Sequence, residues 1–266
     1  MSLVSRRLRA GASLMAATAM LAGLIIVSPS STLASSGGGS FTCSGGVLAG
    51  GSYNSVVVTG PCQVVAGSVT VQGNLTIAPG GELIAAFDGN NVAVAGNLSV
   101  GANSVLVLGC DSEAFPCMDN PAGFASATIA GNLSATGALS EIVHDTAVAG
   151  NLTVLGGGGG VNCDPQGALF GFPAYATFEQ VTVGKNASIT DWHSCWLGFF
   201  RNHVTGNMTF NNNITADPDG NEIQTNWIGQ NLSCSNNSPA PQQGDSQGLP
   251  NVVGGKALGQ CASLTQ

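Results

Sequence analysis

The stretch Val94-Ala95-Gly96-Asn97-Leu98-Ser99-Val100 is one copy of a repeat that decides the fold. Its pattern is apolar-x-Gly-Asn-Leu-Ser/Thr-apolar, and successive asparagines are 23, 35, 19, 35, 21 and 24 residues apart. The two long intervals contain extra residues, so we interpret them as loop insertions in a basic period of about 19 to 24 residues. The asparagines that anchor the copies are Asn74, Asn97, Asn132, Asn151, Asn186, Asn207 and Asn231.

Apolar and polar columns alternate around each anchor. The position three residues before the Asn holds Val71, Val94, Ile129, Val148, Val183, Val204 and Ile228. The positions one and three residues after it are also largely apolar, whereas the position between them is always a hydroxyl: Thr76, Ser99, Ser134, Thr153, Ser188, Thr209 and Ser233. Alternation with a period of two predicts strand with one buried face.

One such strand cannot bury its face alone, but copies stacked at about 4.8 Å per coil form a continuous core. A coil of this length predicts an all-β fold, a three-sided right-handed parallel β-helix, and argues against the left-handed type with its hexapeptide repeat. Stacked Asn amides are expected to hydrogen-bond from coil to coil. The Gly before the Asn in five copies permits a tight bend or a positive φ.

The first 34 residues have the layout of a cleavable secretory signal peptide. Arg6, Arg7 and Arg9 precede an apolar run, and small residues follow it up to Ala34. No second apolar stretch of spanning length follows, so no membrane span is expected after cleavage.

Three further segments are predicted in the mature chain. Residues 35–60, rich in Gly and Ser, are expected to lead into an N-terminal cap. Residues 61–233 are expected to form the β-helix, and residues 234–266, with Pro239 and Pro241, a C-terminal cap loop. Such caps would protect the open ends of a solenoid from edge-to-edge pairing.

The mature chain is strongly acidic. It retains all 14 acidic residues but only Lys185, Arg201 and Lys256 of the basic ones, so three minus fourteen gives a net charge of −11 with His neutral. Such a chain lacks the basic patch that binds nucleic acid or anionic membranes.

All eight cysteines lie in the mature part, and an even number after a secretory signal predicts disulfides. Sequence order suggests one of the 105 pairings that eight cysteines allow. That pairing is Cys43 with Cys62, Cys110 with Cys117, Cys163 with Cys195, and Cys234 with Cys261.

The coils at about residues 60–233 resemble the right-handed parallel β-helix (pectin-lyase-like) superfamily, the fold of pectate lyases and many bacterial surface proteins. They also look like uncharacterised secreted proteins of actinobacteria. The resemblance implies an architecture but no activity, because that superfamily includes lyases, hydrolases, adhesins and passive scaffolds. No catalytic motif of the superfamily matches here, so no residue role is carried over.

The segment 191–203 differs from the repeat in composition, since it contains two of the three His and two of the three Trp. Glu222 and Trp227 follow about one coil later. Candidate catalytic residues are Asp191, His193, Arg201, His203 and Glu222, with Lys185 as a further cation; Trp192, Trp196 and Trp227 are candidates for stacking on a ligand. Structural packing of a loop explains the same residues. His144 and Glu179 each lie seven residues before an anchor, so their side chains are expected to stack if those coils are adjacent.

A polysaccharide lyase would use a base and a cation from this set. A glycosidase would use two carboxylates about 5 to 9.5 Å apart, for which Asp191 and Glu222 are the pair to test. No compact metal-ligand motif is present: Asp191, His193 and His203 lack metal-site spacing, and the acidic stretch 217–222 lacks the spacing of an EF-hand. The sequence therefore predicts no metal and no cofactor.

Three functions compete. The first is a secreted or cell-surface structural or binding protein without catalysis, whose partner is an extracellular glycan or a component of the cell envelope. The second is a polysaccharide-active enzyme that uses the Asp191–His203 cluster. The third is ice binding through the hydroxyl column, which the mixed neighbouring column (Thr70, Ala93, Thr128, Ala147, Thr182, His203, Trp227) disfavours.

Overall fold

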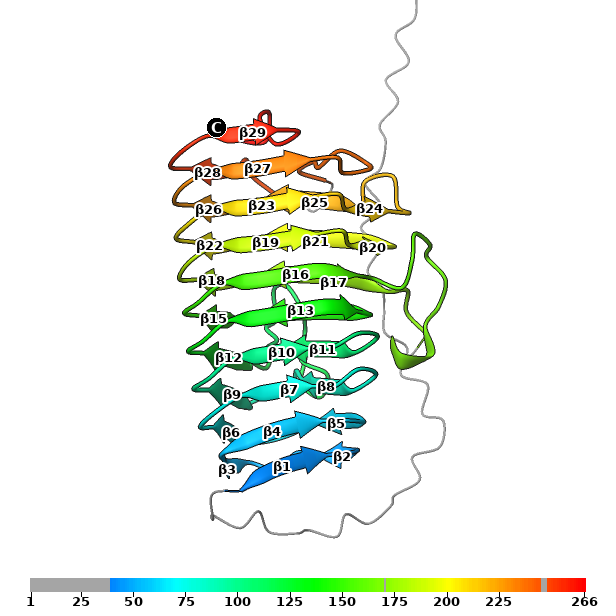
Figure 1. Ribbon diagram of the computed structural model, residues 1–266, viewed down its shortest axis with the longest axis vertical. Helices are drawn as coiled ribbons and strands as arrows, with labels where there is room; N and C mark the ends of the chain where they lie inside the picture. Colours follow the sequence, from blue (N-terminus) through cyan, green and yellow to red (C-terminus); the bar gives the residue numbers. More distant parts are fainter. Residues whose placement is uncertain (1–38, 170, 245–247) are drawn as a thin grey trace, which may run out of the picture. The chain divides into compact units, whose positions relative to one another are not determined.

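The computed structural model describes residues 39–169, 171–244 and 248–266, and the predicted signal peptide lies outside them. The described chain is a parallel β-solenoid whose successive coils contribute strands to three sheets of 10, 8 and 9 strands (Figure 1). Between residues 39 and 266, helical structure in the described part is limited to one 3₁₀ turn, Gly167–Leu169.

Sheet A has 10 strands, all paired in parallel, and each strand from the third to the ninth directly follows an Asn anchor. Its strands in spatial order are β1 (Ser40–Cys43), β4 (Ser55–Val58), β7 (Leu75–Ile77), β10 (Leu98–Val100), β13 (Leu133–Ala138), β16 (Leu152–Gly157), β19 (Ala187–Thr190), β23 (Met208–Asn211), β27 (Leu232–Ser235) and β29 (Ala257–Gly259). The seven hydroxyl residues of the repeat are register partners along this sheet, as the repeat predicts.

Sheet B has 8 strands, and its outer face contains the candidate functional site. Its strands are β2 (Gly46–Val47), β5 (Pro61–Gln63), β8 (Glu82–Ala85), β11 (Val105–Leu108), β14 (Ser140–His144), β17 (Tyr175–Glu179), β21 (Trp196–Phe200) and β25 (Asn221–Gln224).

Sheet C has 9 strands, each of which leads into the next strand of sheet A. Its strands are β3 (Gly51–Tyr53), β6 (Ser68–Val71), β9 (Asn91–Val94), β12 (Ser126–Ile129), β15 (Thr146–Val148), β18 (Thr182–Val183), β22 (His203–Val204), β26 (Trp227–Ile228) and β28 (Val252–Val253). A separate pair, β20 (His193–Ser194) and β24 (Ile214–Thr215), lies between sheets A and B along the chain.

The repeat is a corner rather than one straight strand. The apolar residue before each Asn ends a sheet C strand, and the residue after the Asn begins a sheet A strand. All three apolar columns are buried in one core. The hydroxyl column therefore lies on the outer face of sheet A, whereas the mixed Thr/Ala column lies across the bend on sheet C.

The Asn anchors form the predicted ladder. At each step the side-chain Oδ1 of one anchor accepts a hydrogen bond from the backbone N–H of the next, as Asn97 does from Asn132 at 2.9 Å. The anchor glycines are required by close packing: none of the five within the described residues has a positive φ. A Cβ on Gly131, for example, would lie 2.5 Å from Asn97 Oδ1 and 2.5 Å from the Gly96 carbonyl oxygen.

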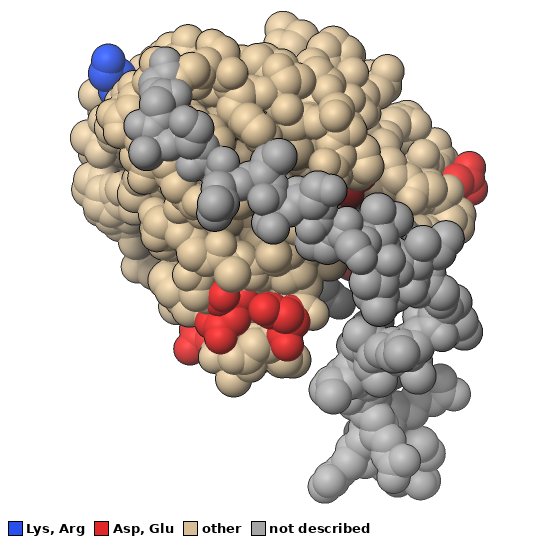
Figure 2. All heavy atoms as spheres, turned by 90° about the horizontal axis from the view of Figure 1, so that it is seen from below, with Lys and Arg blue, Asp and Glu red and all other residues tan. Residues whose placement is uncertain are grey.

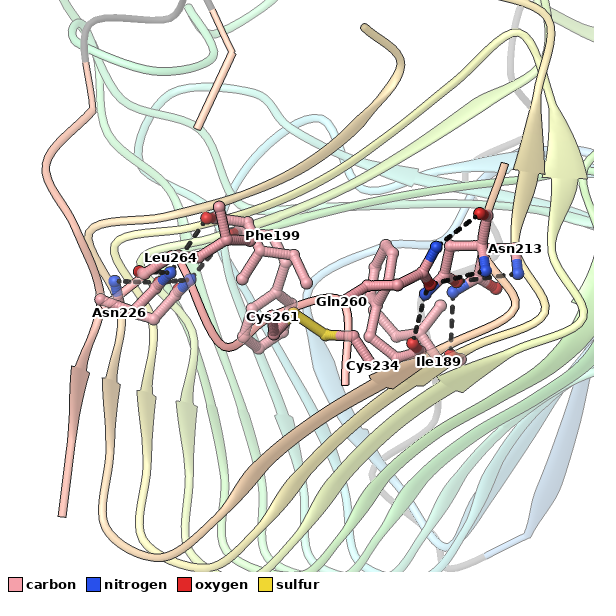
Figure 3. The surroundings of a disulfide bond; sticks show 12 residues. Ile189, Phe199, Asn213, Asn226, Cys234, Gln260, Cys261 and Leu264 are labelled. Atoms are coloured by element: carbon pink, nitrogen blue, oxygen red, sulfur yellow. Dashed lines mark hydrogen bonds between the residues drawn. A yellow bond between two sulfur atoms is a disulfide. The ribbon is translucent and has the colours of Figure 1, made fainter. Parts of the chain in front are cut away.

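The four disulfides connect the cysteines in the predicted order (43–62, 110–117, 163–195 and 234–261). Parallel strand pairs also occur on both sides of residues 61–233: β1 pairs with β4 before this range, and β29 pairs with β27 after it. Figure 3 shows the Cys234–Cys261 disulfide at the C-terminal end of the solenoid. Next to it, Gln260 Oε1 accepts a hydrogen bond from the Asn237 side-chain amide.

Two further Asn ladders, which the repeat does not reveal, run through the buried corners near this end (Figure 3). The first ladder consists of Asn202, Asn226 and Asn251. The Oδ1 of each accepts a hydrogen bond from a backbone N–H of the preceding coil, and the amide N–H groups donate to backbone carbonyls of the core, such as Phe199 O. In the other, Asn213 and Asn237 do the same. Each ladder thereby satisfies polar backbone groups that bending leaves unpaired in the interior.

The two long intervals are insertions that leave the stack beside sheet B. The first insertion spans residues 109–125, between β11 and β12, and contains Cys110–Cys117. The second insertion spans residues 158–174, between β16 and β17 (green in Figure 1), and is tied to the coil that follows by Cys163–Cys195. A second apolar cluster lies between these insertions and sheet B, so that part of this sheet is covered on both faces.

One carboxyl group lies inside the main core. Glu141 is fully buried, and its register partners on the neighbouring coils are Leu106 and Ala176, both core residues. Burial raises the pKa of Glu141 to about 8, because the charged form loses its hydration. Neither carboxyl oxygen has a hydrogen-bond partner among the described residues, so the neutral acid is the favoured form at neutral pH.

Candidate functional site

The predicted 191–203 cluster is spread around one coil and does not form one site. Asp191 is the bend residue after β19, with φ 59°, and His193 begins β20. Arg201 is the bend residue after β21, with φ 52°, and His203 lies in β22 on sheet C. A coil of about 20 residues passes all three sheets, which separates residues that are close in sequence.

The three tryptophans lie in three different environments. Trp192 is fully buried in the core, where its indole N–H donates to Ser194 Oγ at 2.8 Å. Trp227 is exposed and stacks on His203 on sheet C, with ring centroids 4.1 Å apart. Trp196 is half-buried on the outer face of sheet B, and its indole N–H donates to Glu222 Oε1 at 3.1 Å.

Glu222 is covered by the C-terminal segment. The residue is buried, Gln224 donates to its Oε2, and Gly244 packs against its carboxyl group. Asp191 follows a sheet A strand, whereas Glu222 lies on the outer face of sheet B. The two carboxylates predicted for a glycosidase thus belong to different corners of the solenoid.

The outer face of sheet B brings together polar and aromatic residues from successive coils. His144, Glu179 and Phe200 are register partners in one column, and Tyr175 and Trp196 are partners in another. Together with residues of the first insertion they line a cavity of about 330 Å³, called here the polar cavity. The residues of its lining that matter for its chemistry are Glu113, His144, Tyr175, Glu179, Trp196 and Arg201.

His144, Glu179 and Arg201 form a linked row in this cavity. His144 Nδ1 lies 3.6 Å from Glu179 Oε2, which confirms the stacking predicted from their equal distances to the anchors. The guanidinium of Arg201 forms an ion pair with the Glu179 carboxylate. Burial lowers the pKa of His144 to about 4, and the Arg201 charge acts in the same direction although Asp111 opposes it. The imidazole is therefore neutral at physiological pH.

The ring nitrogens of His144 are buried and lack hydrogen-bond partners within the described residues. A neutral imidazole offers one donor and one acceptor. Buried polar groups are normally paired, so the two unpaired nitrogens of this cavity-lining residue are an exception, and a bound polar group would reach them only if the imidazole turned toward the cavity.

Asp111 and Asp145 form a hydrogen-bonded pair, and the Asp111 charge acts on His144. The N–H groups of Glu113 and Ala114 donate to Asp111 Oδ1 at 2.7 and 2.6 Å. Burial raises the pKa of Asp111, but these bonds outweigh it and lower the pKa overall. Burial and the Asp111 charge raise the pKa of Asp145 to about 7. Neither aspartate was predicted from the sequence, although Asp145 follows His144 and Asp111 follows Cys110, because neither lies in the repeat.

No three His, Cys, Asp or Glu side chains gather as a metal would require within residues 39–169, 171–244 and 248–266. The same residues contain no helix long and apolar enough to cross a membrane. No family model, curated protein or solved structure matches the chain. The assignment of a β-solenoid therefore depends on the strand pairing alone, and membership of the pectin-lyase-like superfamily stays a prediction.

Proposed function

We propose that this chain is a secreted or cell-surface binding protein that holds a hydroxyl-rich ligand, a neutral glycan, in the polar cavity on sheet B. The observation that carries the proposal is His144, a buried neutral imidazole with two unpaired nitrogens at the wall of a cavity. A sugar hydroxyl both donates and accepts hydrogen bonds, so it can pair with either nitrogen once the imidazole turns toward the cavity.

The rest of the lining supports a sugar. Tyr175, Trp196 and Phe200 form a row of neighbouring rings, with centroids 6.3 and 5.5 Å apart. Flat rings of this kind present apolar faces to a ligand with a polar edge. Glu179 and Glu113 offer carboxylate acceptors, whereas the one basic group, Arg201, is already paired with Glu179.

Charge favours a neutral ligand over an acidic one. The chain has a formal net charge of −8 with the N-terminal segment included, which would repel polyanions. Figure 2 shows a largely uncharged face with gathered acidic groups. Four disulfides and the basic, then apolar, N-terminal segment support an extracellular location.

The test is a binding titration of the oxidised protein against a panel of neutral and acidic oligosaccharides by calorimetry. His144→Leu removes the unpaired nitrogens at similar volume and is expected to weaken binding at least tenfold, since a hydrogen bond and its desolvated partner are lost. His203→Ala, on sheet C, is the matched control and is expected to bind like the parent. Equal binding by His144→Leu and the parent, or no binding across the panel, would overturn the proposal.

A second candidate is a polysaccharide-cleaving enzyme at the same cavity. It is favoured by the 3.6 Å separation of His144 Nδ1 from Glu179 Oε2, because catalytic hydrogen bonds are often long before a substrate binds, and a carboxylate beside an imidazole can orient a general base. An assay for new reducing ends and unsaturated products separates the two candidates. Product that is lost in His144→Leu and kept in His203→Ala supports catalysis, whereas binding without product supports the first candidate.

A further inference from the structure

A second cavity, of about 270 Å³, lies on the same outer face of sheet B and is called here the apolar cavity. Its floor contains Ile84, Val107 and Ile142, which are register partners on three successive coils. On sheet A the corresponding outer positions are hydroxyls. These three residues are buried in the second apolar cluster, so this part of sheet B is apolar because the insertions cover it, and the cavity is the space that the insertions leave beside them.

The walls of the apolar cavity come from the two insertions. Phe115 and Met118 belong to the first insertion, and Leu169 and Phe172 to the second. Cys110–Cys117 closes a loop within the first insertion, and Cys163–Cys195 ties the second insertion to the following coil. A disulfide therefore constrains each insertion, which favours a preformed cavity.

The two cavities are adjacent, because Phe115 and Tyr175 line both of them. A ligand that passes between these two rings would extend from one cavity into the other. Each volume is near or below the lower end of the roughly 300–1,000 Å³ typical of small-molecule sites. The walls of one cavity are apolar, and the other is lined by polar side chains, among them Glu179 and His144.

We propose that the apolar cavity binds the hydrocarbon chain of an amphiphile whose sugar head occupies the polar cavity, that is, a ligand of the glycolipid class. This inference rests on the proposed function, because it takes the head to be a glycan. The adjacency of an apolar and a polar cavity selects the occupant: a single flexible chain attached to a hydroxyl-rich head matches both linings at once.

The test is a calorimetric titration with alkyl glucosides that share one head and differ in chain length, all below their micelle-forming concentrations. Affinity is expected to rise about fourfold for each added methylene, from about 0.8 kcal/mol per buried CH₂, and to level off when the cavity is full. Free glucose is the reference for the head alone.

Two variants and one control locate the chain. Val107→Phe fills the floor, and Phe172→Ser removes an exposed wall, so both are expected to flatten the dependence on chain length while glucose binding is kept. Val252→Ser changes an exposed apolar residue on sheet C and is expected to behave like the parent. Using both variants guards against a folding defect in Val107→Phe, because Phe172 is 56% exposed.

The outcomes separate the two proposals. If alkyl glucosides bind no more tightly as their alkyl chain lengthens, the amphiphile inference is overturned, and the proposed function stands. Equal binding of an alkyl glucoside and the matching fatty alcohol, with no effect of His144→Leu, overturns the glycan head and with it the proposed function. A chain-length dependence unchanged in both Val107→Phe and Phe172→Ser overturns the assignment to this cavity.

Discussion

His144 Nδ1 lies 3.6 Å from Glu179 Oε2 although 35 residues separate them in the chain. Strands β14 and β17 pair in parallel, and this register places the two side chains in one outward column. In a solenoid the neighbour of a residue lies one coil away, so a site is built from columns rather than from sequence clusters. The polar cavity follows from this rule.

The ion pair beside His144 should matter for stability. Arg201→Met leaves the Glu179 carboxylate buried without its cation, which is expected to lower the free energy of unfolding by about 1–3 kcal/mol. Arg201 is 40% exposed at its side chain, so the loss should stay below that of a fully buried pair. Urea unfolding of the single variant and of Glu179→Gln/Arg201→Met measures it. A double variant no more stable than Arg201→Met would contradict the explanation.

Glu141 should make the protein less stable as pH rises. Its folded-state pKa, about 8, lies above the ordinary value of 4.5. The free energy of unfolding is therefore highest, as far as Glu141 is concerned, below the pKa of the carboxyl group in the unfolded chain. It falls by roughly 3–5 kcal/mol as pH rises from there toward about 8. Asp145, with a pKa of about 7, adds a loss of the same sign. His144, whose pKa is lowered, acts oppositely and only below about 6.5.

Glu141→Gln is therefore expected to be more stable than the parent at pH 8 and to differ little at pH 4. Thermal unfolding between pH 4 and 9 shows the difference. An identical pH slope in the parent and the variant would mean that the carboxyl group is not held in the core as described. Asp145→Asn serves as a second variant, whose effect should be confined to lower pH.

The repeat predicted the architecture from local information. The Asn anchors define the register of sheets C and A, because each anchor bonds the next and the apolar columns on both sides are buried. Two long intervals correspond to two insertions, and sequential cysteines pair because each pair bridges the same or adjacent coils. These features depend on residues near one another in the repeat.

The site could not be predicted in the same way. Asp191 and Arg201 stand out in the sequence, yet both are bend residues with positive φ. Sheet B lies outside the repeat motif, so nothing in the sequence shows that Glu141 points inward and His144 outward. The buried Asn ladders could not be predicted for a similar reason. Asn202 and Asn226 each follow a bend residue, which is recognised by its positive φ and not by its residue type.

The exposed and buried Asn ladders should differ in their contributions. Asn132→Ala removes bonds at the surface, where water replaces them, and is expected to cost about 1 kcal/mol. Asn226→Ala leaves the Asn202 N–H and Phe199 O unpaired in the interior, and is expected to cost about 2–4 kcal/mol for two buried groups. Denaturant unfolding compares them. Equal losses would show that the interior groups find other partners.

The anchor glycines should tolerate no side chain. A methyl group on Gly131 would meet the Gly96 carbonyl and Asn97 Oδ1 of the previous coil, and neither can move without breaking the ladder. Gly131→Ala is expected to lower the melting temperature strongly. Gly167→Ala, in the second insertion where a Cβ meets open space, is the matched control and should leave it unchanged. Similar melting temperatures for the two variants would refute close packing as the reason for the glycine.

The most direct test of the binding proposal is ¹⁵N NMR of the histidine side chains during titration with a neutral oligosaccharide that binds in the calorimetric panel. His144 lines the polar cavity with unpaired nitrogens, whereas His193 and His203 lie on other elements of the same solenoid. If the ligand occupies the polar cavity, saturable shifts are expected at the His144 ring nitrogens, with little change at the other two histidines. Saturable binding that shifts His203 and leaves His144 unchanged would place the ligand on sheet C and overturn the proposed function.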